Sequence, residues 1–177
     1  MGNGADRIAE ILVKNNVKYV FAYAGGAVSF LIDAIDRAGI ALVISRHEQA
    51  SAFMASAYSK AGHGIGVCLA TSGPGATNLI TGIADAYYDY TPMVALTGQV
   101  DSKYLNNGTI HRQAGFQQVD IINMVEPITF FADTMEESDV IDIDTSYNVL
   151  KKAFRLSYMG KAPTLVDIPM DIQKMVV

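Results

Sequence analysis

Clusters of basic residues are missing from this sequence, and their absence argues against one large class of function. The 177 residues include 13 lysines and arginines against 18 aspartates and glutamates, which gives a formal net charge of −5. Binding of a nucleic-acid backbone requires clustered lysine and arginine side chains, and no basic run occurs anywhere. We therefore expect no nucleic-acid partner.

Long apolar runs and cysteines are also scarce. No segment approaches the ~18 consecutive apolar residues of a membrane span, and residues 1–6 lack the pattern of a signal peptide. The single cysteine, Cys68, cannot form a disulfide within the chain, which indicates a reducing compartment. We interpret it as a small buried strand residue, because no neighbour would lower the pKa of its thiol. A soluble, cytoplasmic protein without a membrane partner is expected.

The composition fits one globular domain that covers residues 1–177. Half of the residues are apolar and 18% are charged, which is typical of a chain with a packed core. The length leaves room for one core and is too short for two domains of ordinary size.

Helix and strand patterns alternate along the chain, and this alternation predicts the fold class. Apolar runs predict strands at 19–23, 40–44, 65–71, 92–97 and 163–168, with a short one at 128–131. Helices are predicted at 5–15, 27–37, 48–61, 76–88 and 146–159. The sequence thus predicts an α/β three-layer sandwich, with a mostly parallel central sheet and helices on both faces. Ligands of such folds bind beyond the carboxyl ends of the strands.

A glycine-rich turn connects a predicted strand to a predicted helix at residues 71–78, TSGPGATN. Free backbone N–H groups at a helix start can bind an anion or a phosphate. The turn is not a Walker loop, since no Gly-Lys-Ser/Thr follows, and it does not match the dinucleotide fingerprint. From the residues alone, an anion site and an ordinary strand-to-helix turn remain equally open.

Glu48 lies in the segment Arg46-His47-Glu48-Gln49, where a predicted strand gives way to a helix rich in small residues. A carboxyl group there would lie near the carboxyl edge of the sheet, and desolvation would help it to exchange a proton near neutral pH. A glutamate favoured only by the helix macrodipole is the alternative explanation. No pair of the three histidines has the spacing of metal ligands, so we expect no metal on this chain alone.

Four segments resemble the amino-terminal domain of acetohydroxyacid (acetolactate) synthases and their relatives. They are VFAYAGGAV (20–28), RHEQASAFMASAYSKAGHGIGVCLATSGPGATNLITGIADAYYDYTPMVALTGQV (46–100), FQQVDI (116–121) and PTLVDIPMDIQ (163–173). The resemblance covers nearly the whole chain and implies the pyrimidine-binding (PYR) domain and fold of a thiamine-diphosphate (ThDP) enzyme. It further implies pyruvate decarboxylation and condensation in branched-chain amino acid biosynthesis.

The resemblance also implies roles for individual residues. Glu48 would hydrogen-bond a ring nitrogen of the aminopyrimidine and favour the imino tautomer of its exocyclic amine, which then acts as the internal base. Gln117 would face the reaction centre, and Phe116 would form a wall of the substrate pocket. The remaining residues implied to contact the aminopyrimidine are Tyr23, Gly25, Gly26, Thr71, Pro74 and Asn78.

Departures from the family pattern leave the reaction open. Ala24 replaces a proline, the stretch 100–116 is longer than expected, and Gln118 stands where a glutamate is usual. Phe130 stands where the synthases carry a lysine, which would alter the active-site entrance. A decarboxylase that does not ligate, for example of the sulfopyruvate type, is therefore a second hypothesis, and a non-catalytic assembly module is a third.

The Gly-Asp-Gly motif that marks the diphosphate-binding domain of this family does not occur in the sequence. The resemblance therefore implies that this domain, with its Mg²⁺, lies outside the chain, either on a longer polypeptide or on a separate subunit. Alone, the chain is expected to be inactive. For the full enzyme, the resemblance also implies a homodimer and a 2-oxo acid substrate. It leaves open whether FAD is a further cofactor.

Overall fold

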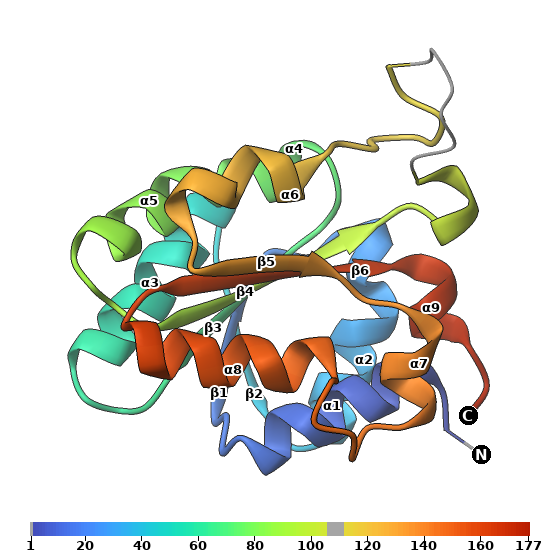
Figure 1. Ribbon diagram of the computed structural model, residues 1–177, viewed down its shortest axis with the longest axis horizontal. Coiled ribbons are helices and arrows are strands. Elements are labelled where there is room, and N and C mark those ends of the chain that lie inside the picture. Colours follow the sequence, from blue (N-terminus) through green and yellow to red (C-terminus); the bar gives the residue numbers. More distant parts are fainter. Residues whose placement is uncertain (1, 106–111) are drawn as a thin grey trace.

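A computed structural model describes residues 2–105 and 112–177 and contains a six-stranded sheet in the order β2-β1-β3-β4-β6-β5 (Figure 1). Every pair of neighbouring strands is parallel. The strands are β1 (Tyr19–Ala22), β2 (Ala41–Ile44), β3 (Gly66–Ala70), β4 (Met93–Gln99), β5 (Phe131–Thr134) and β6 (Pro163–Pro169).

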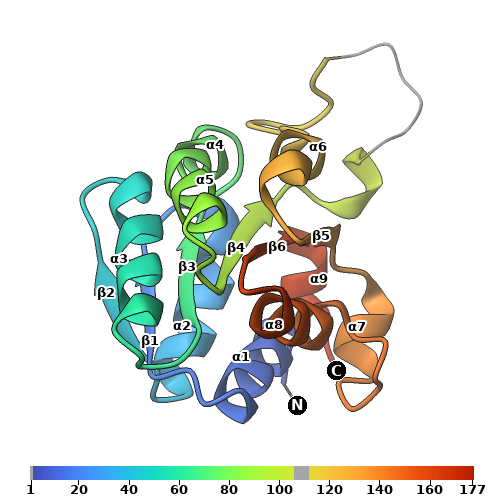
Figure 2. The same ribbon diagram turned by 60° about the vertical axis from the view of Figure 1, so that its left-hand side comes forward.

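Helices cover both faces of this sheet (Figures 1 and 2). One layer contains α1 (Gly4–Lys14), α2 (Ser29–Arg37), α7 (Glu137–Ile141), α8 (Val149–Gly160) and α9 (Met170–Lys174). The other contains α3 (Glu48–Lys60), α4 (Pro74–Asn78), α5 (Ile80–Tyr88) and α6 (Ile121–Val125). Short 3₁₀ turns occur at η1 (Gly26–Val28), η2 (Ser102–Tyr104) and η3 (Glu126–Ile128). The predicted α/β class with a parallel sheet between two helical layers is confirmed.

The central strands are buried on both faces, which explains their continuous apolar sequence. In β3, Val67 and Leu69 pack into the core on the α1 and α8 side, whereas Cys68 and Ala70 pack against α3 and α5. Burial raises the pKa of the Cys68 thiol to about 12. Cys68 is therefore the buried strand residue that was predicted, and its thiol stays protonated near neutral pH.

Two of the predicted elements have other bounds in the structure, and three short helices were not predicted. Ile128 belongs to η3, and β5 starts only at Phe131, because Pro127 suits the first turn of a helix rather than a strand. The predicted helix at 76–88 begins earlier, at Pro74, and is divided at Leu79 into α4 and α5. The short helices α6, α7 and α9 carry too few residues to show a helical period and were not predicted.

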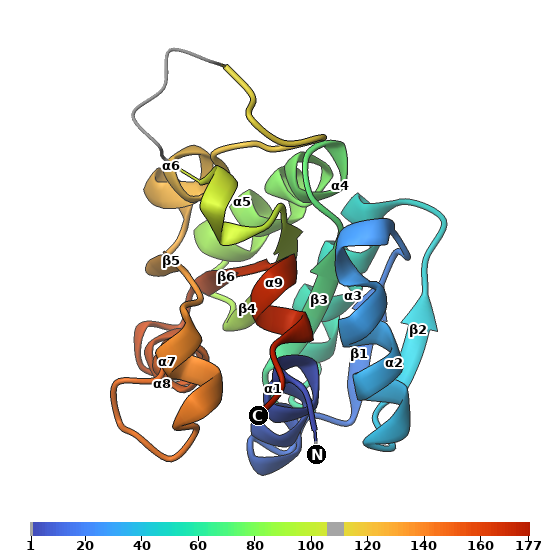
Figure 3. The same cartoon turned by 90° about the vertical axis from the view of Figure 1, so that its right-hand side faces the viewer.

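The two ends of the described chain lie side by side (Figure 3). Asn3 forms an antiparallel bridge with Val176, and the Gly4 N–H donates to the Met175 carbonyl over 2.8 Å. None of the described helices combines the length and the apolar character that a bilayer span requires.

Candidate functional site

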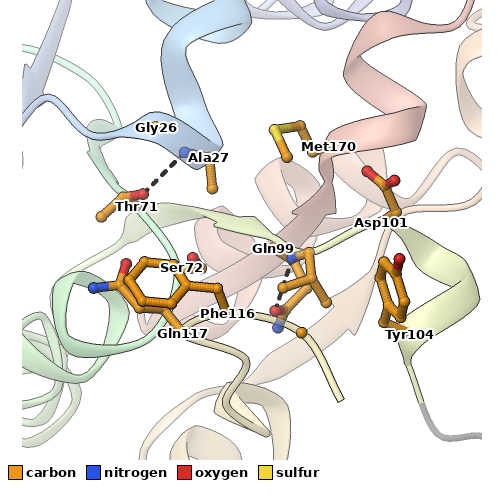
Figure 4. Close-up of a pocket in the computed structure, with 12 residues that line it drawn as sticks. Gly26, Ala27, Thr71, Ser72, Gln99, Asp101, Tyr104, Phe116, Gln117 and Met170 are labelled. Carbon is orange, nitrogen blue, oxygen red and sulfur yellow. Dashed lines mark hydrogen bonds between the residues drawn. The ribbon is translucent and has the colours of Figure 1, made fainter. Parts of the chain in front are cut away.

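A cavity of about 400 Å³ lies at the carboxyl edge of the sheet (Figure 4). The turns after β1, β3, β4 and β6 converge there, as expected for a parallel sheet. The residues that line it are Gly26, Ala27, Thr71, Ser72, Gln99, Val100, Asp101, Tyr104, Gly115, Phe116, Gln117 and Met170. Four of them, Gly26, Thr71, Phe116 and Gln117, were predicted as site residues from the sequence.

Glu48 occupies the first position of α3, and two neighbouring groups fix it there. The His47 side chain caps the helix by accepting a hydrogen bond from the Gln49 N–H over 3.2 Å. The Glu48 side chain points into the protein, since the residue is only 8% exposed. Its Oε2 accepts a hydrogen bond of 2.9 Å from Nδ2 of Asn78, the last residue of α4. The carboxyl group thus ties the start of α3 to the end of α4.

Two glycines lie against the Thr71 side chain, and one of them also faces Glu48. A Cβ atom on Gly25 would lie 2.4 Å from Cβ of Thr71, and one on Gly75 would lie 2.7 Å from its Cγ2. The same Cβ on Gly75 would lie 3.4 Å from Oε1 of Glu48. Thr71 Oγ1 accepts a hydrogen bond of 3.2 Å from the Ala27 N–H (Figure 4). We refer to Gly25, Thr71, Gly75, Glu48 and Asn78 as the glycine cradle.

Gly73 and Gln117 meet in left-handed backbone conformations. Their φ angles are +61° and +59°, and a Cβ on Gly73 would lie 2.6 Å from the Gln117 carbonyl oxygen. Only glycine fits at position 73, because a side chain would both strain the backbone and collide with position 117. This contact fixes the backbone of Gln117 at the cavity, while the adjacent Phe116 is 85% exposed.

The structure separates the predicted site residues into groups. Gly26, Thr71, Phe116 and Gln117 line the cavity, and Glu48, Gly25 and Asn78 join it through the glycine cradle. Tyr23 and Pro74 are exposed residues of the same two turns and do not line the cavity.

Phe130 lies at the opposite edge of the sheet, just before β5 begins. A second pocket, of about 350 Å³, is formed there with Tyr87, Tyr88, Tyr90, Gly160 and Ala162. Phe130 therefore does not line the cavity, and its effect on the entrance of the full active site stays a prediction.

The sequence analysis missed the polar pair Gln99 and Asp167, although each lies near the end of a largely apolar strand. The two side chains are 2% exposed. Asp167 accepts hydrogen bonds from Thr97 Oγ1 over 2.6 Å and from Gln99 Nε2 over 2.8 Å. Gln99 Nε2 also donates to the Val119 carbonyl over 3.0 Å, two residues after Gln117. The pair thus links β6 and β4 to the segment that carries Gln117.

The buried Asp167 predicts a pH-dependent stability. Burial raises the pKa of its carboxyl group from 3.8 to about 7, although the hydrogen bonds from Thr97 and Gln99 oppose this rise and the charge of Asp120 adds to it. Because the pKa is higher in the folded state, folding favours the protonated form. The contribution of Asp167 to the free energy of unfolding is complete below pH 3.8 and is lost as the pH rises through 7.

We expect urea unfolding to give a free energy of unfolding lower by about 3 kcal/mol at pH 8 than at pH 5. The Asp167→Asn variant should lose this difference, whereas Asp133→Asn, at an exposed carboxyl group of β5, should keep it. If the free energy of unfolding depends on pH in the same way in wild type and Asp167→Asn, the pH dependence does not come from Asp167.

The described residues contain no cluster of metal ligands. Across residues 2–105 and 112–177, no group of three or more histidine, cysteine, aspartate or glutamate side chains could hold a metal ion. His111 lies outside the described residues.

The sequence profile of the family described as "Thiamine pyrophosphate enzyme, N-terminal TPP binding domain" matches residues 2–124. The chain belongs to this family. Acetolactate synthase 2 of Zea mays is 42% identical to this TPP binding domain over 173 residues, which cover 97% of the chain and 25% of the maize protein. The acetolactate synthase isozyme 2 large subunit of Escherichia coli strain K12 is 39% identical over 175 residues, or 97% of the chain and 29% of that protein.

An archaeal protein gives a similar match. The probable acetolactate synthase large subunit of Methanococcus aeolicus is 36% identical to the TPP binding domain over 174 residues, covering 98% of the chain and 27% of that subunit. The chain thus spans between 25% and 29% of the length of these relatives. The resemblance to acetolactate synthases and the assignment to thiamine-diphosphate enzymes are confirmed.

Proposed function

We propose that this domain binds the aminopyrimidine of thiamine diphosphate and activates the cofactor, as half of the active site of a 2-oxo acid carboligase of the acetolactate synthase type. The observation that carries the proposal is the buried Glu48 carboxyl group, held by Asn78 at the carboxyl edge of the sheet. The match to the TPP binding family and the acetolactate synthase relatives support it.

We assign the aminopyrimidine ring to the side of the glycine cradle where Glu48 has an oxygen that Asn78 does not bind. Gly25 and Gly75 let the Thr71 side chain pack against the backbone of both turns, because a Cβ on either glycine would overlap with it. Oε2 of Glu48 accepts the hydrogen bond from Asn78, and within the described residues Oε1 accepts none. That oxygen is the one we assign to a ring nitrogen.

The residues have distinct roles in this proposal. Glu48 exchanges a proton at Oε1, Asn78 holds the carboxyl group, and the backbone at Gly25 and Gly26 supports the ring. Gln117 and Phe116 line the adjoining cavity and would face a 2-oxo acid. Thiamine diphosphate, when bound, supplies the carbon nucleophile that decarboxylation and ligation require. Tyr23, Thr71 and Pro74 would complete the ring-binding surface.

The diphosphate needs a second unit, on the same polypeptide or on another. We propose that this unit holds the diphosphate through Mg²⁺ and docks on the edge that bears the glycine cradle, within a homodimer. Apolar side chains exposed around this edge support the docking: Tyr23, Ile44, Phe53 and Phe116 are 38%, 57%, 39% and 85% exposed. FAD, if the full enzyme uses it, would bind outside the cavity and the glycine cradle. The single buried Cys68 supports a reducing compartment such as the cytoplasm.

A decarboxylase that releases a free aldehyde is the second candidate reaction. The main sequence argument for this reaction was the replacement of a lysine by Phe130. That residue lies at the edge of the sheet remote from the cavity. We therefore favour ligation.

Calorimetry and product analysis test the proposed function. Titration of thiamine diphosphate with Mg²⁺ into the 177-residue chain should show no micromolar affinity, because the diphosphate makes most of its contacts on the second unit. The enzyme that carries this domain should convert pyruvate into acetolactate. A free aldehyde as the main product would favour the decarboxylase, and tight binding by the chain alone would contradict the half-site.

A further inference from the structure

The Gln118 side chain joins the two arms of the loop that follows β4. Its Oε1 accepts hydrogen bonds from the Ala114 N–H over 2.7 Å and from the Gly115 N–H over 3.2 Å. Its Nε2 donates to the carbonyl oxygen of Tyr104 over 3.0 Å. Tyr104 ends the 3₁₀ turn η2 on one arm, and Ala114 and Gly115 belong to the other. One amide group therefore bridges two backbone segments ten residues apart in the chain.

The chemistry of this bridge requires an amide. The Ala114 and Gly115 groups are donors and need an acceptor, whereas the Tyr104 carbonyl is an acceptor and needs a donor. Glutamine supplies both at once, but an ionised glutamate has only acceptors and would repel the carbonyl oxygen. The glutamine at position 118 therefore suits both arms of the loop at once.

Both arms that Gln118 bridges form walls of the 400 Å³ cavity. Tyr104 lines one side, and Gly115, Phe116 and Gln117 line another. Gly115 lies against Val100, because a Cβ there would be 2.8 Å from Cγ1 of Val100. The next residue after Gln118 is Val119, whose carbonyl oxygen is held by Gln99. The segment 115–119 is therefore fixed to β4 at its end and to Tyr104 through Gln118.

We propose that Gln118 is a positioning residue that clasps the two arms of this loop and so sets the place of Tyr104 and of Phe116–Gln117 at the cavity. The clasp itself is a property of the 177-residue chain. Its effect on substrate binding rests on the proposed function.

The Gln118→Glu variant tests the clasp separately on each arm. At pH 7 the new carboxylate still accepts from Ala114 and Gly115 but repels Tyr104, so only the η2 arm should be released. The Leu105 N–H, which donates to the Ser102 carbonyl over 2.9 Å at the end of η2, should exchange with deuterium roughly five- to tenfold faster than in wild type. The Ala114 and Gly115 amides should keep their protection.

A change of pH should restore the clasp in the same variant. Below the carboxyl pKa of about 4.3, the protonated group regains an O–H donor, and the Leu105 exchange ratio to wild type should return towards one. Ala114→Glu adds a similar charge to the same loop at an exposed position and should leave Leu105 unchanged. Equal Leu105 exchange in wild type and Gln118→Glu at pH 7 would overturn the clasp.

Kinetics of the enzyme that carries this domain test the consequence at the site. Gln118→Glu should raise KM for the 2-oxo acid by roughly three- to tenfold and change kcat less, because the cavity walls move while Glu48 keeps its place. An unchanged KM would overturn the positioning role. A wild-type enzyme with no activity on 2-oxo acids would sink the proposed function, and the exchange experiment would still decide the clasp.

Discussion

Replacement of Glu48 by glutamine is expected to lower the activity of the full enzyme on pyruvate by at least about 100-fold, the usual scale of general acid–base catalysis. The change is nearly isosteric, and the oxygen of the new amide can still accept the 2.9 Å hydrogen bond from Asn78. Packing at the start of α3 should therefore survive. What is lost is the proton that the carboxyl group can exchange at its second oxygen.

Steady-state rates of acetolactate formation measure this effect, and thermal unfolding of the variant checks that the fold is intact. Glu137→Gln makes the same chemical change at an exposed position of α7 and should leave the rate unaltered. If Glu48→Gln retains full activity, the catalytic assignment fails, and the domain is better described as an assembly module.

Replacement of Gly98 by alanine is expected to reduce the free energy of unfolding by about 3 kcal/mol. Gly98 lies in β4, and a Cβ there would be 2.3 Å from the Ala27 carbonyl oxygen and 2.7 Å from Cγ1 of Val28. Backbone cannot give way as a flexible side chain does, so either β4 or the turn after β1 must move. Both carry walls of the cavity, which makes the substitution a test of the site as well as of stability.

Urea unfolding of Gly98→Ala and of Gly26→Ala gives a matched comparison. A Cβ on Gly26 would meet no atom within 4 Å. Gly26→Ala should therefore change stability by no more than about 0.5 kcal/mol, although the two glycines belong to the same corner of the fold. If both variants lose a similar free energy of unfolding, the close approach of β4 to the turn after β1 is not the reason why position 98 needs a glycine.

The sequence predicted the sheet well because its central strands are buried on both faces and read as unbroken apolar runs. It also placed Thr71 and Gln117 at one site, which the cavity brings together. It could not predict that Gln118 bridges Tyr104 and Ala114, since that contact depends on the course of an irregular loop. It also could not predict that Phe130 lies before the start of β5, away from the cavity. The resemblance identified position 130 as one where a lysine is replaced, but it did not give the direction of the strand that follows.

The parallel arrangement of all six strands has a consequence for how the site is made. No neighbouring pair can be closed by a hairpin, so every pairing brings together residues far apart in the chain, such as Cys68 and Ala95 or Thr97 and Asp167. Such a topology has a high contact order and folds slowly compared with one built from local contacts. The turns at Gly25, Thr71 and Gln117 meet only after β1, β3 and β4 have paired. The cavity is thus a late product of folding, and its formation in a refolding experiment should lag behind the recovery of helix content.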